Sequence, residues 1–153
     1  MNGLGAILRA ASTTVALALL SGMALAAQTI EVLTTAGCGC CIGWARHMEQ
    51  NGFTAELRNL PMADLMQVKI GAGLKPGQTS CHTGRIDGCA IEGHVPAGEV
   101  KRLLAERPDA IGLTVPDMPY GSPGMGEAGP DADPHDVLLV RRDGTTEVFA
   151  SYR

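Results

Sequence analysis

Aromatic side chains and clustered positive charges are both scarce in this chain of 153 residues. Phe, Trp and Tyr together make up only 3% of the sequence, so a hydrophobic core has to be built from aliphatic side chains and methionine. The formal net charge is -4 at pH 7, and no run of Lys or Arg offsets it. Because affinity for a phosphate backbone needs clustered cations, nucleic acid is not an expected partner.

Strongly apolar stretches are also missing, except near the N-terminus. Arg9 is the only charged residue before the first predicted strand, and an apolar stretch at 13–20 precedes the small residues Ala24 and Ala26. These features are typical of a secretory signal peptide. We expect cleavage after Ala26 and export to the periplasm, which leaves 27–153 as one domain without a membrane segment. The alternative is a membrane anchor, although the apolar stretch is shorter than the roughly 20 residues that span a bilayer.

The rest of the chain alternates between strand and helix patterns. β-rich or alternating segments predict strands at 29–34, 53–60, 85–92, 110–115, 137–140 and 147–151. Helical patterns with Pro or Gly near their ends predict helices at 42–50, 61–70 and 96–106. The dipeptide Asp143-Gly144 predicts a hairpin turn between the last two strands. This order, with cysteines at a strand-to-helix junction, predicts an α/β thioredoxin-like fold. The Gly/Pro-rich stretch at about 116–136 would form an irregular C-terminal extension.

Three of the five cysteines lie within four residues, at the start of the first predicted helix. Cys38 and Cys41 have the Cys-x-x-Cys spacing of redox proteins, and Cys40 lies between them. Exposed N–H groups and the helix dipole stabilise an anion at such a position, which lowers the pKa of a thiol. We therefore expect Cys38 to be the exposed catalytic thiol and Cys41 its redox partner.

The additional thiol of Cys40 indicates a metal. Soft thiolates select Cu(I), zinc or iron–sulfur clusters over hard cations. The chain has neither the paired Cys-x-x-Cys spacings of a zinc ribbon nor the longer cysteine runs of iron–sulfur proteins, so copper is the best match. The alternative is a set of ordinary disulfides in an exported protein. Five cysteines cannot all pair within one chain, however, and a bridge between the adjacent Cys40 and Cys41 would be strained.

Two further cysteines occur later in the chain. Cys81 lies in a polar loop, where it could be a fourth thiolate ligand or a resolving thiol. Its neighbour His82 could equally face solvent or bind the metal. Cys89 falls in a predicted strand and is expected to be a buried small hydrophobic residue. His47, in the first predicted helix, is expected at the surface.

The remaining candidate ligands are a histidine and two methionines. His94 directly precedes Val95-Pro96, which we expect to lie against the redox cysteines, as a Pro-containing loop does in thioredoxin-like proteins. Met118 and Met125 lie in the irregular extension, where a methionine has little packing role. Their thioethers suit Cu(I), so we include both with His94 as candidate metal ligands.

Taken together, these motifs resemble the CopG family of copper-resistance proteins. The resemblance rests on Cys38-Gly39-Cys40-Cys41 with Trp44, Ser80-Cys81-His82-Thr83, Ile91-Glu92-Gly93-His94-Val95-Pro96-Ala97, Arg102-Leu103-Leu104, Gly112-Leu113, Val115-Pro116 and Met118-Pro119 with Gly121-Ser122-Pro123-Gly124-Met125. It implies a multinuclear copper cluster bridged by cysteine sulfurs, which would come from Cys38, Cys40, Cys41 and Cys81. The extension would add Met or His ligands. The family usually has Tyr at the position of Cys89.

The leading hypothesis is a monomeric periplasmic protein of copper resistance that binds copper and interconverts Cu(I) and Cu(II). A periplasmic copper efflux system would be a further partner. One alternative is a metal-free thiol–disulfide oxidoreductase that uses Cys38 and Cys41. Another is a redox-silent copper carrier, whose ligands would be the same residues.

Overall fold

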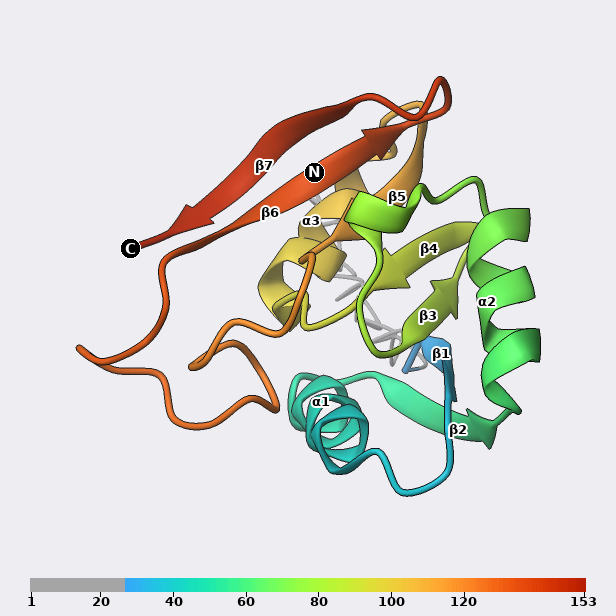
Figure 1. Cartoon of the computed structure of the whole chain (residues 1–153). Coiled ribbons are helices and arrows are strands. Elements are labelled where there is room, and N and C mark those ends of the chain that lie inside the picture. The colour runs from blue at the N-terminus through green and yellow to red at the C-terminus, as the bar shows by residue number, and fades with distance from the viewer. Residues whose placement is uncertain (1–26) are drawn as a thin grey trace, which may run out of the picture.

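A single seven-stranded sheet runs through residues 27–153, which are the residues that the computed structural model describes (Figure 1). The predicted signal peptide and its cleavage site lie outside the described residues. Within 27–153, no helix has the length and apolar character needed to cross a membrane. The elements are β1 (Thr29–Thr34), α1 (Gly39–Gln50), β2 (Thr54–Asn59), α2 (Met62–Gly71), the 3-10 turn η1 (Pro76–Gln78), β3 (Thr83–Ile86), β4 (Cys89–Glu92), α3 (Ala97–Glu106), β5 (Ala110–Thr114), β6 (His135–Arg141) and β7 (Thr146–Tyr152).

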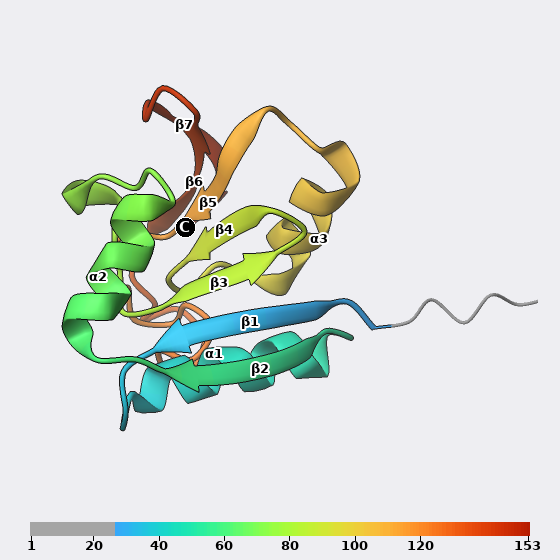
Figure 2. The same ribbon diagram turned by 90° about the vertical axis from the view of Figure 1, so that its right-hand side faces the viewer.

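The strand order is β2-β1-β3-β4-β5-β6-β7. The pairs β1–β2 and β4–β5 are parallel, and the other neighbouring pairs are antiparallel. Helices α1 and α3 lie on one side of the sheet and α2 lies on the other (Figures 1 and 2). A βαβ unit followed by α2 and a ββα unit is the thioredoxin-like arrangement, which confirms the predicted fold class. Strands β5, β6 and β7 widen this sheet at one edge.

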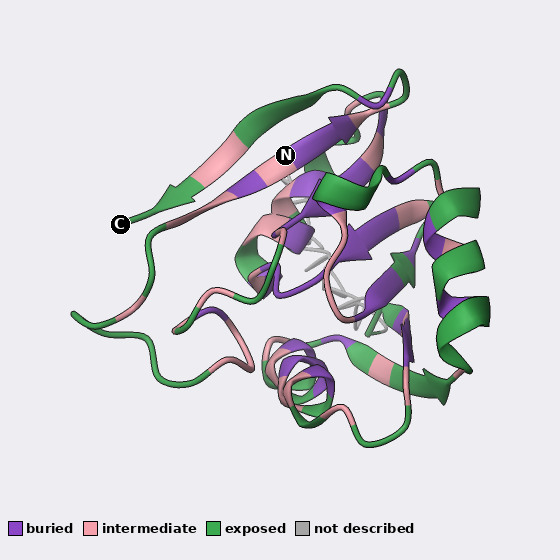
Figure 3. Cartoon of the chain, viewed as in Figure 1, coloured by how far each residue is buried: buried purple, intermediate pink, exposed green. Residues whose placement is uncertain are grey.

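The hydrophobic core lies between the sheet and the two helices α1 and α3. It includes Trp44 and Met48 of α1, Val100 of α3, and Ile30 and Ile91 of the sheet, all of them inaccessible to solvent. Buried positions follow the central strands and the inner faces of these helices, whereas α2 is exposed over most of its surface (Figure 3). Trp44 is the largest side chain of this core, so α1 is anchored chiefly by that residue.

The segment 85–92, predicted as one strand, is instead a tight hairpin. Strands β3 and β4 pair directly, and they are joined by Asp87 and Gly88 with φ angles of 49° and 79°. A two-residue turn with both φ angles positive matches the twist of the flanking strands and favours Asp-Gly. The single-strand prediction was wrong because this dipeptide is a turn signal and not a weak strand position.

The C-terminal hairpin is confirmed at Asp143-Gly144, where Gly144 has a φ of 77°. Its pairing was not predicted: β6 pairs antiparallel with β5 and so extends the central sheet. Between Thr114 and His135 the chain forms turns and bends but no helix or strand. This excursion leaves the sheet after β5, passes beside α1 and then returns to the sheet at β6 (Figure 1).

His47 connects α1 to α3. It is half-buried, contrary to the expected surface position, and its Nε2 accepts a hydrogen bond of 3.0 Å from the Ala97 amide. The first N–H groups of a helix have no partner within the helix, so His47 caps α3 from a different element. Burial lowers the pKa of His47, which keeps the imidazole neutral and able to accept this bond.

This capping predicts a specific loss of stability in mild acid. The unfolded state binds a proton at His47 near pH 6.5 while the native state does not, so stability falls as the pH drops below that value. His82 and His94 have lowered pKa values and contribute in the same direction. We expect His47→Gln, which keeps an acceptor but does not titrate, to reduce the pH dependence of urea unfolding between about pH 7.5 and 5.5. His47→Ala should cost about 1 kcal/mol at neutral pH. An unaltered pH dependence in His47→Gln would contradict the cap.

Candidate metal centre

Four cysteine sulfurs meet at the N-terminus of α1. The sulfurs of Cys38, Cys40, Cys41 and Cys81 all lie within 4.8 Å of one another. The first three follow a turn at Gly37, whose φ of 79° lets the chain leave β1 and enter the helix directly. Cys81 belongs to the loop that leads into β3, the neighbour of β1 in the sheet. Sheet pairing therefore brings two sequence regions about 40 residues apart onto one site.

Two of these cysteines form a disulfide and two are free thiols. Cys38 and Cys41 are bonded, with their Cα atoms 5.3 Å apart. The Cys40 sulfur is 3.5 Å from that of Cys38 and 3.7 Å from that of Cys81. Cys41 is fully buried, whereas Cys38 is partly exposed and is therefore the accessible end of the disulfide. This group can exchange two electrons at the bonded pair and still offer two further thiols.

Two buried histidines face Cys81. The Nε2 of His94 is 3.1 Å from the Cys81 sulfur, and the Nδ1 of His82 is 3.3 Å from it. The other ring nitrogen of His94 donates to the Pro123 carbonyl at 2.8 Å, because a carbonyl oxygen can only accept. Its Nε2 must then present a lone pair to the sulfur. Burial lowers the pKa of both imidazoles, so both are neutral at pH 7 and available as ligands.

The Cys81 thiol is held in its protonated form when no metal is present. Burial, followed by the neighbouring Cys40, raises the pKa of Cys81 to about 12. A metal ion would have to displace this proton, because only the thiolate is a strong ligand. Metal binding at Cys81 would therefore release a proton at neutral pH.

The irregular extension packs onto this centre through Pro123 and Gly124. Gly124 has a φ of 87°, and a Cβ atom there would lie 2.6 Å from both the Cys40 carbonyl oxygen and the Trp44 amide nitrogen. Only glycine allows so close an approach at that φ angle. The Trp44 ring donates to the Val95 carbonyl at 2.8 Å and so fixes the His94 loop to the same helix. Helix α1, the His94 loop and the extension thus enclose one site.

Comparison with known proteins places this arrangement in a family. Two solved structures, named copper resistance protein copG Form 1 and Form 2, are each 43% identical to the chain. Form 1 aligns with 82% of this chain and 98% of its own length at a TM-score of 0.76. Form 2 aligns with 83% and 99% at a TM-score of 0.75. The chain belongs to the CopG family.

Of two other comparisons, one matches only part of the chain and one finds no match. A family model described as a protein of unknown function, DUF411, matches residues 78–125, the part of this CopG-family chain that contains Cys81 and His94. None of the curated protein sequences matches it. The structural relatives confirm both the resemblance read from the sequence and the thioredoxin-like fold.

His82 is absent from the ligand set predicted from sequence. Its ring centroid lies 4.5 Å from that of Trp44 and 5.1 Å from that of His94, and the residue is inaccessible to solvent. Its Nε2 is buried without a hydrogen-bond partner among the described residues. The only sequence signal was its position next to Cys81, and a histidine in a polar loop is usually exposed. Cys81, His82 and His94 form a second group of possible ligands that shares Cys81 with the first.

The two methionines flank the docked part of the extension. Met125 directly follows Gly124 and is partly buried. Met118 is 51% exposed and follows Asp117, whose carbonyl accepts a hydrogen bond from the Ser80 hydroxyl. The residue before Met118 therefore contacts Ser80, next to Cys81, and the residue before Met125 contacts α1. Both methionines stay predicted ligands.

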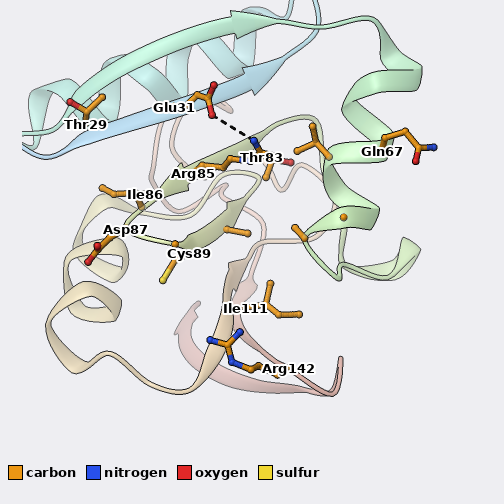
Figure 4. A pocket seen from close by; sticks show the side chains of 15 residues that line it. Thr29, Glu31, Gln67, Thr83, Arg85, Ile86, Asp87, Cys89, Ile111 and Arg142 are labelled. Atoms are coloured by element: carbon orange, nitrogen blue, oxygen red, sulfur yellow. Dashed lines mark ion pairs between the residues drawn. The ribbon is translucent and has the colours of Figure 1, made fainter.

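The fifth cysteine of this CopG-family chain lies away from the sulfur group. Cys89 is half-buried at the start of β4 and packs against the hydrophobic core, much as expected. It also lines a groove of about 740 Å³ beside α2, where the exposed Arg85–Glu31 ion pair lies (Figure 4). It is a matched control for thiol substitutions in the centre.

The raised pKa of Cys81 predicts slow alkylation. With the Cys38–Cys41 disulfide intact, iodoacetamide at about pH 8 should modify Cys81 about a hundredfold more slowly than free cysteine, because so little thiolate is present. Cys40→Ser removes the two effects of Cys40 on this pKa, so the rate at Cys81 should rise. Peptide mass spectrometry over a time course measures both rates. Equal rates in Cys40→Ser and the Cys89→Ser control would contradict the coupling of the two thiols.

Proposed function

We propose that this chain is a periplasmic protein of copper resistance that binds several copper ions through its cysteine group and interconverts Cu(I) and Cu(II). The observation that carries the proposal is the convergence of four sulfurs with the His94 Nε2 atom on Cys81. Thiolates and imidazole are ligands that suit Cu(I), and no carboxylate belongs to this set. The solved relatives are named copper resistance proteins, which supports the same metal.

The Cys38–Cys41 pair can exchange the electrons that such a reaction needs, since its dithiol form donates two electrons and its disulfide form accepts two. Oxidation of the Cys38 and Cys41 thiols to a disulfide releases two electrons and two protons, which reduce two Cu(II) to two Cu(I). In the reverse direction, two Cu(I) and two protons return the disulfide to thiols and leave two Cu(II). The free thiols of Cys40 and Cys81 can hold copper in either case.

A periplasmic location agrees with the disulfide and with the predicted signal peptide. Disulfides form in oxidising compartments and are rare in the cytosol. A periplasmic copper efflux system would be the further partner that receives copper bound there. We retain a monomer as the working state.

The disulfide also favours a second candidate function. A partly exposed Cys38 bonded to a buried Cys41 at a helix N-terminus is the arrangement of thiol–disulfide oxidoreductases. Such an enzyme would need neither Cys40 nor a metal. The same ligands could also serve a redox-silent copper carrier.

Copper counting separates these functions. The chain from Ala27 onward would be reduced, loaded with Cu(I) without oxygen, freed of excess metal and assayed for copper per chain. We expect several copper ions per chain and, after addition of oxidant, a reversible Cu(II) signal in paramagnetic resonance. Cys40→Ser should lower the count and abolish the reversible signal, whereas Cys89→Ser should change neither.

The other outcomes identify the alternatives. A copper count near zero, with disulfide exchange activity that survives Cys40→Ser, would establish the metal-free oxidoreductase. One tightly held copper without a reversible oxidised signal would establish the carrier.

A further inference from the structure

Helix α2 buries a charged side chain together with Leu65, while three of its large apolar side chains are exposed. Lys69 is 1% exposed, whereas Met62 and Ile70 on the same helix are 61% and 60% exposed. A surface helix ordinarily does the reverse. Burying an ammonium group is costly unless it is paired and hydrogen-bonded, so the position of Lys69 needs a specific reason.

Lys69 closes a buried polar network with Glu92 at the end of β4. Its Nζ donates to the Glu92 Oε1 at 2.5 Å and to the Thr83 hydroxyl at 3.0 Å. The Thr83 hydroxyl donates in turn to the Glu92 Oε2 at 2.6 Å. Thr83 and Glu92 are completely buried and lie directly opposite each other in the β3–β4 pair. Both carboxylate oxygens of Glu92 are therefore engaged.

The network forms hydrogen bonds with the loop that carries Cys81, both before and after this residue. The Ser80 amide, directly before Cys81, donates to the Glu92 Oε1 at 2.7 Å. Thr83, two residues after Cys81, holds the other oxygen. Glu92 also lies two residues before His94, and the intervening Gly93 amide donates to the His82 carbonyl at 3.0 Å. One carboxylate thus ties together the two segments that supply Cys81 and His94.

Stability alone gives little reason for such a network. Buried ion pairs can often be replaced by apolar side chains of similar volume at no cost, because desolvation consumes most of their attraction. What an apolar pair cannot do is accept the hydrogen bonds of Ser80 and Thr83. The loop would then lose its fixed position relative to α1.

We propose that Lys69 and Glu92 are positioning residues that hold Cys81 and His94 in register with the Cys40 sulfur for copper binding. This inference rests on the proposed function as far as copper is concerned. The underlying claim, that the network sets the approach of Cys81 to Cys40, concerns the metal-free protein and can be tested without copper.

Three variants separate positioning from general stability. Lys69→Met/Glu92→Leu replaces the ion pair by apolar side chains. Lys69→Met/Glu92→Gln removes both charges but leaves an amide oxygen that can accept from the Ser80 amide. The control Asp87→Asn/Arg107→Met removes an exposed ion pair of 2.7 Å at the turn of the same hairpin.

The first readout is the distance between two thiols. In a Cys89→Ser background with the Cys38–Cys41 disulfide intact, dibromobimane should bridge Cys40 and Cys81, whose sulfurs are 3.7 Å apart. The yield of the bridged product should fall severalfold in Lys69→Met/Glu92→Leu, recover substantially with Gln at position 92, and stay unchanged in the control. Urea unfolding of each variant shows whether the yields follow stability instead.

The second readout is Cu(I) affinity, measured by competition with a chelator. Loss of groups that orient metal ligands weakens binding by about 10- to 100-fold, and we expect this for Lys69→Met/Glu92→Leu, with partial rescue by Gln. Wild-type bridging and wild-type affinity in a folded Lys69→Met/Glu92→Leu variant would overturn the proposal. The proposal would also be overturned if bridging yield and Cu(I) affinity fell equally in Lys69→Met/Glu92→Leu and Lys69→Met/Glu92→Gln, in proportion to the unfolding free energies of these two variants.

The remaining outcomes are also decisive. If Lys69→Met/Glu92→Leu does not fold, Thr83→Val removes only the hydroxyl that joins the two charged residues, and unchanged bridging and affinity there would overturn the proposal. If the wild-type protein binds no copper, the proposed function fails, while the bridging yields still decide whether the network positions Cys81.

Discussion

The antiparallel pairing of β1 with β3 is the contact on which the centre depends. Leu33 pairs with Thr83 in this register. From that point one strand continues into the turn that carries Cys38, and the other is entered from the loop that carries Cys81. A slip of one residue would turn every side chain of β3 to the opposite face of the sheet and separate the sulfurs. The candidate metal centre is therefore a product of strand register, and the helix N-terminus supplies only one half of it.

The groups of the site are partly or completely buried, and several of them are uncharged. Cys81 is a protonated thiol, both buried histidines are uncharged, and one pair of thiols is joined in a disulfide. Copper would exchange with protons at Cys81 and, when the disulfide is reduced, at Cys38 and Cys41 as well. The buried Lys69–Glu92 pair adds no net charge behind this site. It contributes hydrogen bonds whose geometry is fixed because no water competes for them.

Local patterns allowed most of the fold to be predicted from sequence. β1 and α3 have clear periodicity and end signals, and they agree closely with the expected segments, whereas α1 begins at Gly39, three residues before the predicted start at 42. The β3–β4 hairpin departs from the single strand predicted over 85–92, because Asp87-Gly88 is a local turn signal that divides this segment into two short strands. Cys38, Cys40 and Cys41 could be chosen as candidates because soft ligands are clustered near a helix start, and Cys81 because it lies in a polar loop.

The structural features that could not be predicted from the sequence depend on long-range contacts. Lys69 and Glu92 are 23 residues apart, and nothing local marks either as buried. The burial of His82 depends on Trp44 of α1, and the docking of the extension depends on the close approach of Gly124 to that helix. These features follow from tertiary packing, which overrides the usual exposure of charged and loop residues.

X-ray absorption at the copper edge of the Cu(I)-loaded protein reports the atoms bound to the metal, and so shows directly whether the cysteine group holds copper. We expect sulfur as the main scatterer, with an imidazole contribution that is lost in His94→Gln, and a short copper–copper contact that is lost in Cys40→Ser. A spectrum dominated by oxygen and nitrogen, unchanged in both variants, would instead show that copper binds away from the cysteine group.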